Sequence, residues 1–152
     1  KRPPKIVFHA GTLKHNAGVT FATLRKRDAI HWAEDRPGTR VHTIHHTCSN
    51  PASEDDIRSA AASLGLTDDD FASISPYDND PDYSPFDWLY DVRVRDVIQR
   101  AGHDCAVGND FMFNEDVPVM VLWIPGTFKI VERSDEGTSL LRSYLKLLTS
   151  RR

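Results

Sequence analysis

The sequence predicts an α+β domain with a split, mostly antiparallel β-sheet and flanking helices. Strand-forming segments gather at both ends of the chain and helix-forming segments lie between them, whereas a parallel, doubly wound sheet needs the two to alternate. With 152 residues, 39% of them hydrophobic, the chain is long enough to bury one core and too short for two ordinary domains. We therefore expect residues 1–152 to form a single domain.

The first strand is expected just after a basic arm at residues 1–5, where prolines prevent sheet hydrogen bonding. Ile6–Phe8 is apolar without alternation, which is typical of a strand covered on both faces. His9 ends this run, and Ala10 and Gly11 follow it with little or no side chain, so a ligand can approach the backbone closely. This strand end is a candidate binding site.

A second strand, a helix and a third strand are expected next. Val19–Ala22 is rich in strand-forming residues, and Thr23 is expected to cap a helix over Leu24–Ala33. Trp32 lies in the apolar pattern of this helix, so we expect it in the core. Thr39–Cys48 is rich in β-branched residues and predicts the third strand.

The middle of the chain predicts helices and one exposed loop. Ser53 begins a helix with an acidic first turn that ends at Gly65, and Thr67–Ser73 adds a further turn. Residues 76–83 are rich in proline and aspartate, which predicts an acidic loop. Pro85–Ala101 has apolar residues at near helical spacing and predicts one long helix.

Strands return near the end of the sequence. Asp104–Gly108, the strongly apolar Val117–Ile124 and Phe128–Glu132 predict three strands, and Thr138–Leu148 predicts an amphipathic helix.

Charge and cysteine content suggest the environment of the protein. The net charge is −3, with acidic residues concentrated between Ser53 and Asp91, which predicts a solvated acidic face or a patch that repels or mimics nucleic acid. Cys48 and Cys105 are the only cysteines, so we expect reduced thiols and a cytoplasmic location, with one disulfide between them left open. No apolar run reaches the roughly 18 residues of a membrane span, so no membrane partner is expected.

Histidines on the third predicted strand form a candidate metal site. His42, His45, His46 and Cys48, with His31 upstream, are residue types that bind zinc. They lack the two short-spaced pairs of a structural zinc site, so we expect surface histidines and no bound metal.

Two groups of motifs resemble the ADP-ribosyltransferase superfamily. FHAGT, GVTFAT and RDAIHWAE resemble, in this order, the first strand of the family with its histidine, its second strand and the helix that follows. RAGHDCAVGND and VPVMVLWIPGTFKIV resemble the closing part, where a hydrophobic strand runs into proline. The similarity covers Lys5–Val131 apart from the acidic middle. Within this superfamily, the sequence looks closest to the branch of small, single-domain, toxin-like enzymes, which are PARP-like and similar to the rifampin-modifying enzymes.

The resemblance implies a cleft for NAD+ between the two halves of a split sheet. His9 would hydrogen-bond the ribose, and the backbone of Ala10 and Gly11 would hold the nicotinamide amide. The cofactor-binding residues that it implies are His9, Ala10, Gly11, Thr12, Thr20 and Phe21.

The catalytic residues that the resemblance implies are His9, Thr20 and Glu115. Cleavage of the nicotinamide glycosidic bond leaves a cation on the ribose, which Glu115, or Asp116 beside it, would stabilise. Thr20 stands where the family has tyrosine, and Val119 stands where the family has its glutamate. Glu115 lies four residues before Val119, on the same strand face and roughly 13 Å away.

The expected function is NAD-dependent transfer of ADP-ribose to an unknown acceptor, which is a protein, a nucleic acid or a small molecule. Thr20 and Val119 leave a second interpretation open, a non-catalytic module that keeps this fold and binds a nucleotide or a protein. A third is a hydrolase or phosphotransferase acting on an ADP-ribosyl or RNA end, with Arg25, Lys26 or Arg27 holding phosphate. The oligomeric state is not indicated.

Overall fold

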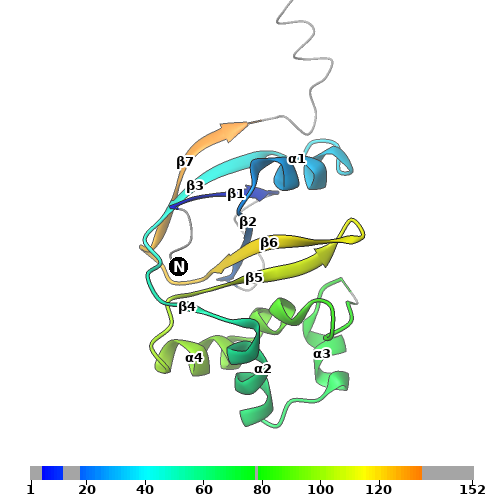
Figure 1. Cartoon of the computed structure of the whole chain (residues 1–152), viewed down its shortest axis with the longest axis vertical. Coiled ribbons are helices and arrows are strands. Elements are labelled where there is room, and N and C mark those ends of the chain that lie inside the picture. Colours follow the sequence, from blue (N-terminus) through cyan, green and yellow to red (C-terminus); the bar gives the residue numbers. More distant parts are fainter. Residues whose placement is uncertain (1–4, 12–17, 78, 135–152) are drawn as a thin grey trace, which may run out of the picture.

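A β-sheet with flanking helices makes up the part of the chain that the computed structural model describes, residues 5–11, 18–77 and 79–134 (Figure 1). The strands are β1 (Ile6–Ala10), β2 (Thr20–Thr23), β3 (Val41–His46), β4 (Pro51–Ala52), β5 (Cys105–Met112), β6 (Glu115–Leu122) and β7 (Phe128–Ser134). The helices are α1 (Lys26–Glu34), α2 (Glu54–Ser63), α3 (Asp68–Ile74), the 3-10 helix η2 (Pro85–Tyr90) and α4 (Val92–Arg100). The predicted helix over Thr138–Leu148 and the arm at residues 1–4 lie outside the described residues.

The sheet has seven strands in the order β4-β5-β6-β2-β1-β3-β7. Neighbouring strands are antiparallel except β4 and β5, which are parallel. Helix α1 lies beside β1 and β3, whereas α2, α3 and α4 lie against the β5–β6 end of the sheet (Figure 1). The predicted α+β class with a mostly antiparallel sheet and flanking helices is confirmed.

Among the central strands, β1 and β2 have the shortest pairing, which we call the joint. Its only register pair is Phe8 with Thr23, whereas β1 and β3 are paired from Ile6 to Ala10. Because the two strands diverge on either side of this pair, part of their main chain must find partners outside the ladder. The sheet is thus continuous, with two halves that meet at a short joint.

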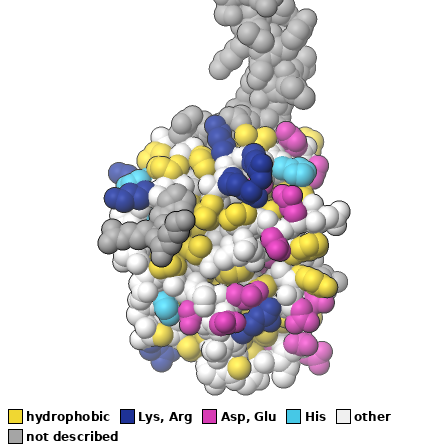
Figure 2. Space-filling model, viewed as in Figure 1, with side chains coloured by type: hydrophobic (Ala, Val, Ile, Leu, Met, Phe, Trp, Pro, Cys, Tyr) yellow, Lys and Arg dark blue, Asp and Glu magenta, His cyan; other side chains and the backbone are white. Residues whose placement is uncertain are grey.

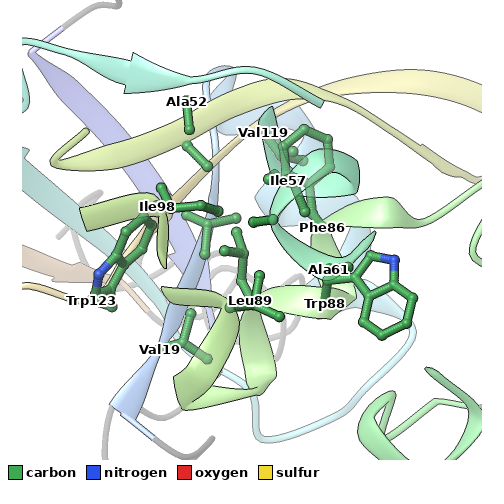
Figure 3. Close-up of a cluster of buried hydrophobic side chains, with 14 of the residues drawn as sticks. Val19, Ala52, Ile57, Ala61, Phe86, Trp88, Leu89, Ile98, Val119 and Trp123 are labelled. Atoms are coloured by element: carbon green, nitrogen blue, oxygen red, sulfur yellow. The ribbon is translucent and has the colours of Figure 1, made fainter. Parts of the chain in front are cut away.

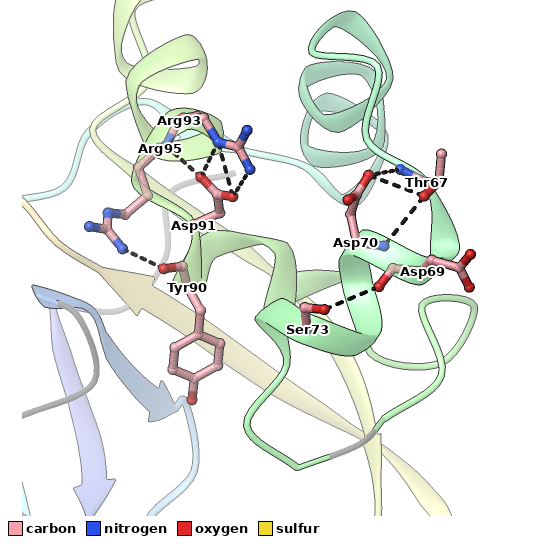
Figure 4. Close-up of polar contacts among 8 residues, drawn as sticks. All are labelled: Thr67, Asp69, Asp70, Ser73, Tyr90, Asp91, Arg93 and Arg95. Carbon is pink, nitrogen blue, oxygen red and sulfur yellow. Dashed lines mark hydrogen bonds and ion pairs between the residues drawn. The ribbon is translucent and has the colours of Figure 1, made fainter.

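Two of the predicted helix starts are confirmed by their capping contacts. In α2 the Ser53 hydroxyl accepts from the Asp56 N–H at 3.2 Å, and the Asp56 carboxylate accepts from the Ser53 N–H at 2.8 Å. Thr67 and Asp70 make the same reciprocal pair at α3 (Figure 4). Helix α1 begins at Lys26, after the predicted start, because the Thr23 hydroxyl donates to the Arg25 carbonyl at 2.8 Å and does not cap the helix. Among the described residues, no helix combines the length and the apolar character needed to cross a membrane.

The single helix predicted over Pro85–Ala101 is wrong, because the chain breaks at Asp91. This residue has an extended conformation, with φ −88° and ψ 122°, and its side chain accepts from the Arg93 N–H at 2.8 Å (Figure 4). Aspartate competes in this way with helical hydrogen bonding, so it ends η2 and caps α4. The buried Arg95 guanidinium donates to the Leu89 carbonyl at 2.8 Å and holds the two helices together.

Acidic side chains gather along the right-hand side of the view in Figure 2. Glu54, Asp55, Asp68 and Asp69, at the starts of α2 and α3, are exposed. The prediction of a solvated acidic face is confirmed for these residues.

The largest buried cluster lies between β5–β6 and the helices. Side chains from η2, α2, α4 and β6 converge there (Figure 3), among them Phe86, Leu89, Ile57 and Ile98, each at most 2% exposed. Phe86 packs directly onto the backbone of Gly108 in β5, where a Cβ atom would lie 2.5 Å from Cζ of the ring. Glycine at this position lets η2 approach the sheet.

Gly108→Ala is expected to lower the free energy of unfolding by about 1–3 kcal/mol, because the added methyl group overpacks the core against Phe86. Urea unfolding measures the loss. In a Phe86→Leu background the smaller side chain leaves space for the added methyl group, so Gly108→Ala is expected to lower the free energy of unfolding by less than it does in the wild type. Equal costs in both backgrounds would show that the ring does not limit this position.

The two cysteines form a disulfide, so the prediction of reduced thiols is wrong. Cys48, after β3, is joined to Cys105, the first residue of β5, across 57 residues of sequence. Cys105 is completely buried. The pair lies side by side because β4, between α2 and the end of β3, pairs with β5 in parallel and returns the chain to the same edge.

Candidate functional site

A pocket of about 460 Å³ opens where β1 and β2 diverge. Its lining comes from these two strands, from α1, from η2 with the loop before it, and from β5 and β6. These elements include both halves of the sheet, so the pocket spans the joint at Phe8 and Thr23.

His9 lies at the edge of the pocket and bridges the diverging strands. Its Nδ1–H donates to the Phe21 carbonyl of β2 at 2.5 Å, which gives this carbonyl a partner outside the ladder. The side chain is 6% exposed. Because Nδ1 carries the donated proton, Nε2 is the acceptor of the neutral ring, and a Cβ atom on Gly11 would lie 3.6 Å from it.

The backbone at Gly11 is held on both sides. Its φ of +123° lies in the region that favours glycine. Its N–H donates to the Arg40 carbonyl at 2.9 Å, and its carbonyl accepts from Nε2 of His42 at 2.7 Å. The strand end is therefore rigid and presents main chain without a side chain, as the sequence predicts for a close approach of ligand.

Aromatic rings form two walls of the pocket. Phe21 stacks on Tyr90 of η2, with ring centroids 4.9 Å apart and planes 18° from parallel. On the side of α1, the Arg36 guanidinium lies 3.6 Å from the ring centroid of Trp32, and Tyr77 meets the same ring edge-on at 6.1 Å. Burial, followed by Tyr77 and Asp87, raises the pKa of Tyr90, so its hydroxyl stays protonated and can donate to a ligand.

Two buried carboxylates face the pocket from different elements. Asp87 of η2 is 3% exposed and accepts from the Ser75 hydroxyl at 2.7 Å and from the Asn79 amide at 2.8 Å. Burial raises the pKa of Asp87, and these two hydrogen bonds oppose the rise. The side chain is thus fixed by its neighbours.

Asp110 of β5 has a different environment. It is 7% exposed, and its Oδ1 atom has no hydrogen-bond partner among the described residues. Burial, with a smaller contribution from the charge of Asp87, raises the pKa of Asp110 to about 7, against the effects of the Ser84 hydroxyl and the Phe111 N–H. A carboxyl group with this pKa can accept or release a proton near neutral pH.

The pocket brings together part of the predicted site. His9, Ala10, Gly11 and Phe21 line it, while Thr12 lies outside the described residues. Thr20 is buried in the sheet opposite Leu122 and is not part of the lining.

The predicted carboxylates also lie outside the pocket. Glu115 and Asp116 are exposed at the start of β6, directly after a tight turn in which Phe113 and Asn114 have positive φ. Val119, four residues after Glu115, does line the pocket. The catalytic roles of Thr20 and Glu115 stay predictions.

Asp87, Tyr90 and Asp110 are the functional candidates that sequence reasoning missed. Asp87 and Tyr90 lie within the predicted long helix, and helical periodicity does not show the face that they share on the 3-10 helix η2. The sequence does contain a signal for Asp110. Ala106, Gly108 and Asp110 are every second residue of β5 and therefore lie on the same face of the strand. The strand predicted to end at Gly108 stops short of it.

Other predictions about side chains need correction. Trp32 is half-buried and lines the pocket, so its assignment to the core is wrong. His42 and His46 are 6% and 1% exposed, so they are not surface histidines. The acidic loop predicted at 76–83 is a loop whose described residues are mostly exposed, as expected, and it also contributes Tyr77 and Asn79 to the lining.

The basic residues considered for phosphate binding do not line the pocket. Arg25 instead makes an ion pair with the buried Asp28, with Nε 2.7 Å from Oδ2, and Arg27 lies 3.9 Å from the other oxygen. Neither these two residues nor Lys26 is part of the lining.

One group of potential metal ligands exists among the described residues, formed by Cys48, Asp104 and Cys105. The two sulfur atoms are joined in the disulfide, and a disulfide sulfur is not the thiolate that binds metals. Asp104 is occupied by the N–H groups of Ser49 and Asn50, at 2.9 and 2.8 Å. The group therefore serves to fix the turn before β4.

No protein-family model matches the chain, and neither a curated protein nor a solved structure matches it.

Proposed function

We propose that the protein binds NAD+ in the pocket at the β1–β2 joint and transfers its ADP-ribose group to an acceptor. One observation carries the proposal: His9, Ala10, Gly11 and Phe21 line a single pocket together with buried carboxylates. These four residues come from the motifs that resemble the ADP-ribosyltransferase superfamily. An ADP-ribosyltransferase-like form of the split sheet belongs to the same proposal, and the short joint at Phe8 supports it.

The pocket offers the contacts that a dinucleotide with a cationic ring needs. Its volume of about 460 Å³ lies within the usual range for small-molecule sites, roughly 300–1,000 Å³. The stacked rings of Phe21 and Tyr90 provide a flat apolar wall for nicotinamide. The Gly11 carbonyl accepts one hydrogen bond from His42 and has a second lone pair that can accept from the nicotinamide amide. Asp87 and Asp110 supply negative charge for the cation that forms on the ribose.

A non-catalytic binding module is the second candidate, because of one specific observation. Val119 lines the pocket where the resemblance places the glutamate of the family, and this side chain has no charge to offer. Such a module binds NAD+ or a related nucleotide without turnover.

The disulfide indicates the kind of cellular compartment in which the protein folds. Bonds of this kind form and persist in oxidising compartments, so Cys48–Cys105 favours folding in such a compartment over the cytoplasmic location that the sequence predicts.

His9→Ala is expected to weaken NAD+ binding about tenfold or more, because it removes a ring that contacts the ligand and orders the joint. Isothermal titration calorimetry with NAD+ measures binding, and chromatography of released nicotinamide measures turnover. His45→Ala is the matched control, since His45 lies on β3 outside the pocket lining. Thermal unfolding checks that both variants fold.

Two results would contradict the proposal. The first is an absence of NAD+ binding by the wild-type protein. The second is an equal loss of binding in the two histidine variants, which would place the ligand elsewhere. Binding without nicotinamide release supports the second candidate.

A further inference from the structure

The register between β5 and β6 places Asp110 beside the position where the resemblance expects a glutamate. Gly108 is paired with Val119, and Asp110 is paired with Val117. Residues two apart on a strand share a face, so Asp110 lies on the same face as Val117 and Val119. It is the diagonal neighbour of Val119, a relationship in which Cα atoms are about 7–8 Å apart and long side chains can interact.

The sheet therefore has a carboxylate next to Val119, on the neighbouring strand. Both residues line the pocket, whereas Glu115 on β6 is exposed and outside it. Gly108, the residue paired with Val119, has no side chain, and Phe86 from η2 fills the space above it.

The Asp110 carboxyl group lines the pocket with one of its oxygen atoms lacking a hydrogen-bond partner among the described residues. Its Oδ1 atom is buried without a partner among the described residues, although burying an unpaired polar atom costs about 1–3 kcal/mol. Asp87, the other carboxylate of the pocket, is held by Ser75 and Asn79. Both of these bonds end on Oδ2 of Asp87, so Asp110 differs from it in having a fully buried oxygen with no partner among the described residues.

We propose that Asp110 is the catalytic base of the reaction, with its carboxylate carried on β5 in place of the β6 position that Val119 occupies. The inference rests on the proposed function. The acceptor, X–H, attacks C1′ of the nicotinamide ribose, and the C1′–X bond forms. The C1′–N bond breaks, its electron pair stays on nicotinamide, which leaves neutral, and the proton of X–H passes to Asp110.

The charges around Asp110 determine when it can act as a base. Asp87 faces it from η2 and Glu54 acts from α2, and both disfavour its ionised form, while Tyr90 is held protonated beside it. His9 from β1 and Arg36, two residues after the end of α1, line the same pocket. Burial is the largest cause of the raised pKa of about 7, so in the free protein the basic form becomes the major one only above about pH 7. Bound NAD+ brings a cationic ring that lowers this pKa.

The test compares Asp110→Asn with Glu115→Gln and Asp96→Asn. Asp110→Asn is expected to slow nicotinamide release about 100-fold or more, as loss of a general base does, while NAD+ affinity stays within a few-fold of the wild type. Glu115→Gln tests the acid that the sequence predicts, and Asp96→Asn, an exposed residue of α4 outside the pocket, is the matched control. Both are expected to retain the wild-type rate.

The dependence of the rate on pH gives a second readout that altered packing alone does not produce. Wild-type kcat/KM for nicotinamide release, which reports the free protein, is expected to rise through neutral pH to a plateau, and the residual kcat/KM of Asp110→Asn is expected to be flat over the same range.

Each outcome decides between the inference and the function on which it rests. If Asp110→Asn releases nicotinamide at the wild-type rate, or if only Glu115→Gln is slow, the role of Asp110 is overturned and the transferase function stands. If the wild type binds NAD+ but releases no nicotinamide at any pH, Asp110 is no base and the non-catalytic module stands. If the wild type does not bind NAD+, the proposed function itself fails.

Discussion

At pH 8, Asp110→Asn is expected to raise the free energy of unfolding by up to about 4 kcal/mol. The pKa of Asp110 is raised from 3.8 to about 7 by burial, and each unit of such a shift corresponds to about 1.36 kcal/mol. The folded state favours the protonated carboxyl. The stability this provides is fully present below the unfolded pKa of 3.8 and is lost as the pH rises towards 7. Above pH 7 the folded protein holds an ionised, buried carboxylate, which asparagine replaces at similar volume.

Urea unfolding at pH 3.5 and pH 8 measures this effect. The two proteins should be about equally stable at the lower pH, where Asp110 is protonated, and differ at the higher one. Asp87, whose pKa is also raised, keeps part of the pH dependence in the variant. A wild type whose stability does not fall between these pH values relative to Asp110→Asn would show that the carboxyl is solvated. The proposed role of Asp110 would make this loss of stability an example of the compromise between stability and activity.

Reduction of the Cys48–Cys105 disulfide is expected to lower the free energy of unfolding by about 4 kcal/mol. The bond closes a loop of 57 residues, and restricting a chain of that length in the unfolded state has this effect in the loop-entropy model. For a protein of this size the melting temperature then falls by about 10 °C.

Differential scanning calorimetry with and without a phosphine reductant measures the shift, in denaturant if needed to expose the buried Cys105. The Cys48→Ser/Cys105→Ser double variant is the control. It should melt near the reduced wild type and be insensitive to the reductant. An unchanged melting temperature in protein shown by thiol titration to be fully reduced would contradict the prediction.

Elements that depend on neighbouring residues could be predicted from the sequence. The capped starts of α2 and α3 require only Ser53 with Asp56 and Thr67 with Asp70, three residues apart in each case. Strand β1 and its end at His9–Gly11 likewise follow from local composition. The part of the candidate site formed by His9, Ala10 and Gly11 could therefore be predicted from the sequence.

Elements that depend on distant contacts could not be predicted. The break at Asp91 is held by Arg95 reaching back to the Leu89 carbonyl, a contact that helical periodicity does not reveal. The disulfide depends on β4 pairing with β5. Asp110 joins the site only through the register of β5 against β6 and the approach of η2, so its identification needed the structure.

The turn between β5 and β6 also determines how costly it is for a ligand to bind. Its Phe113 ring stacks on His31 of α1, with centroids 3.8 Å apart, and so connects this turn, which follows the pocket-lining end of β5, with a helix that also lines the pocket. The distance across the cavity is thereby set before any ligand arrives, which reduces the entropy lost on association. Phe113 also meets the Trp32 ring of α1 edge-on, with centroids 6.4 Å apart, so packing of this one ring against α1 contributes to the preorganisation of the pocket.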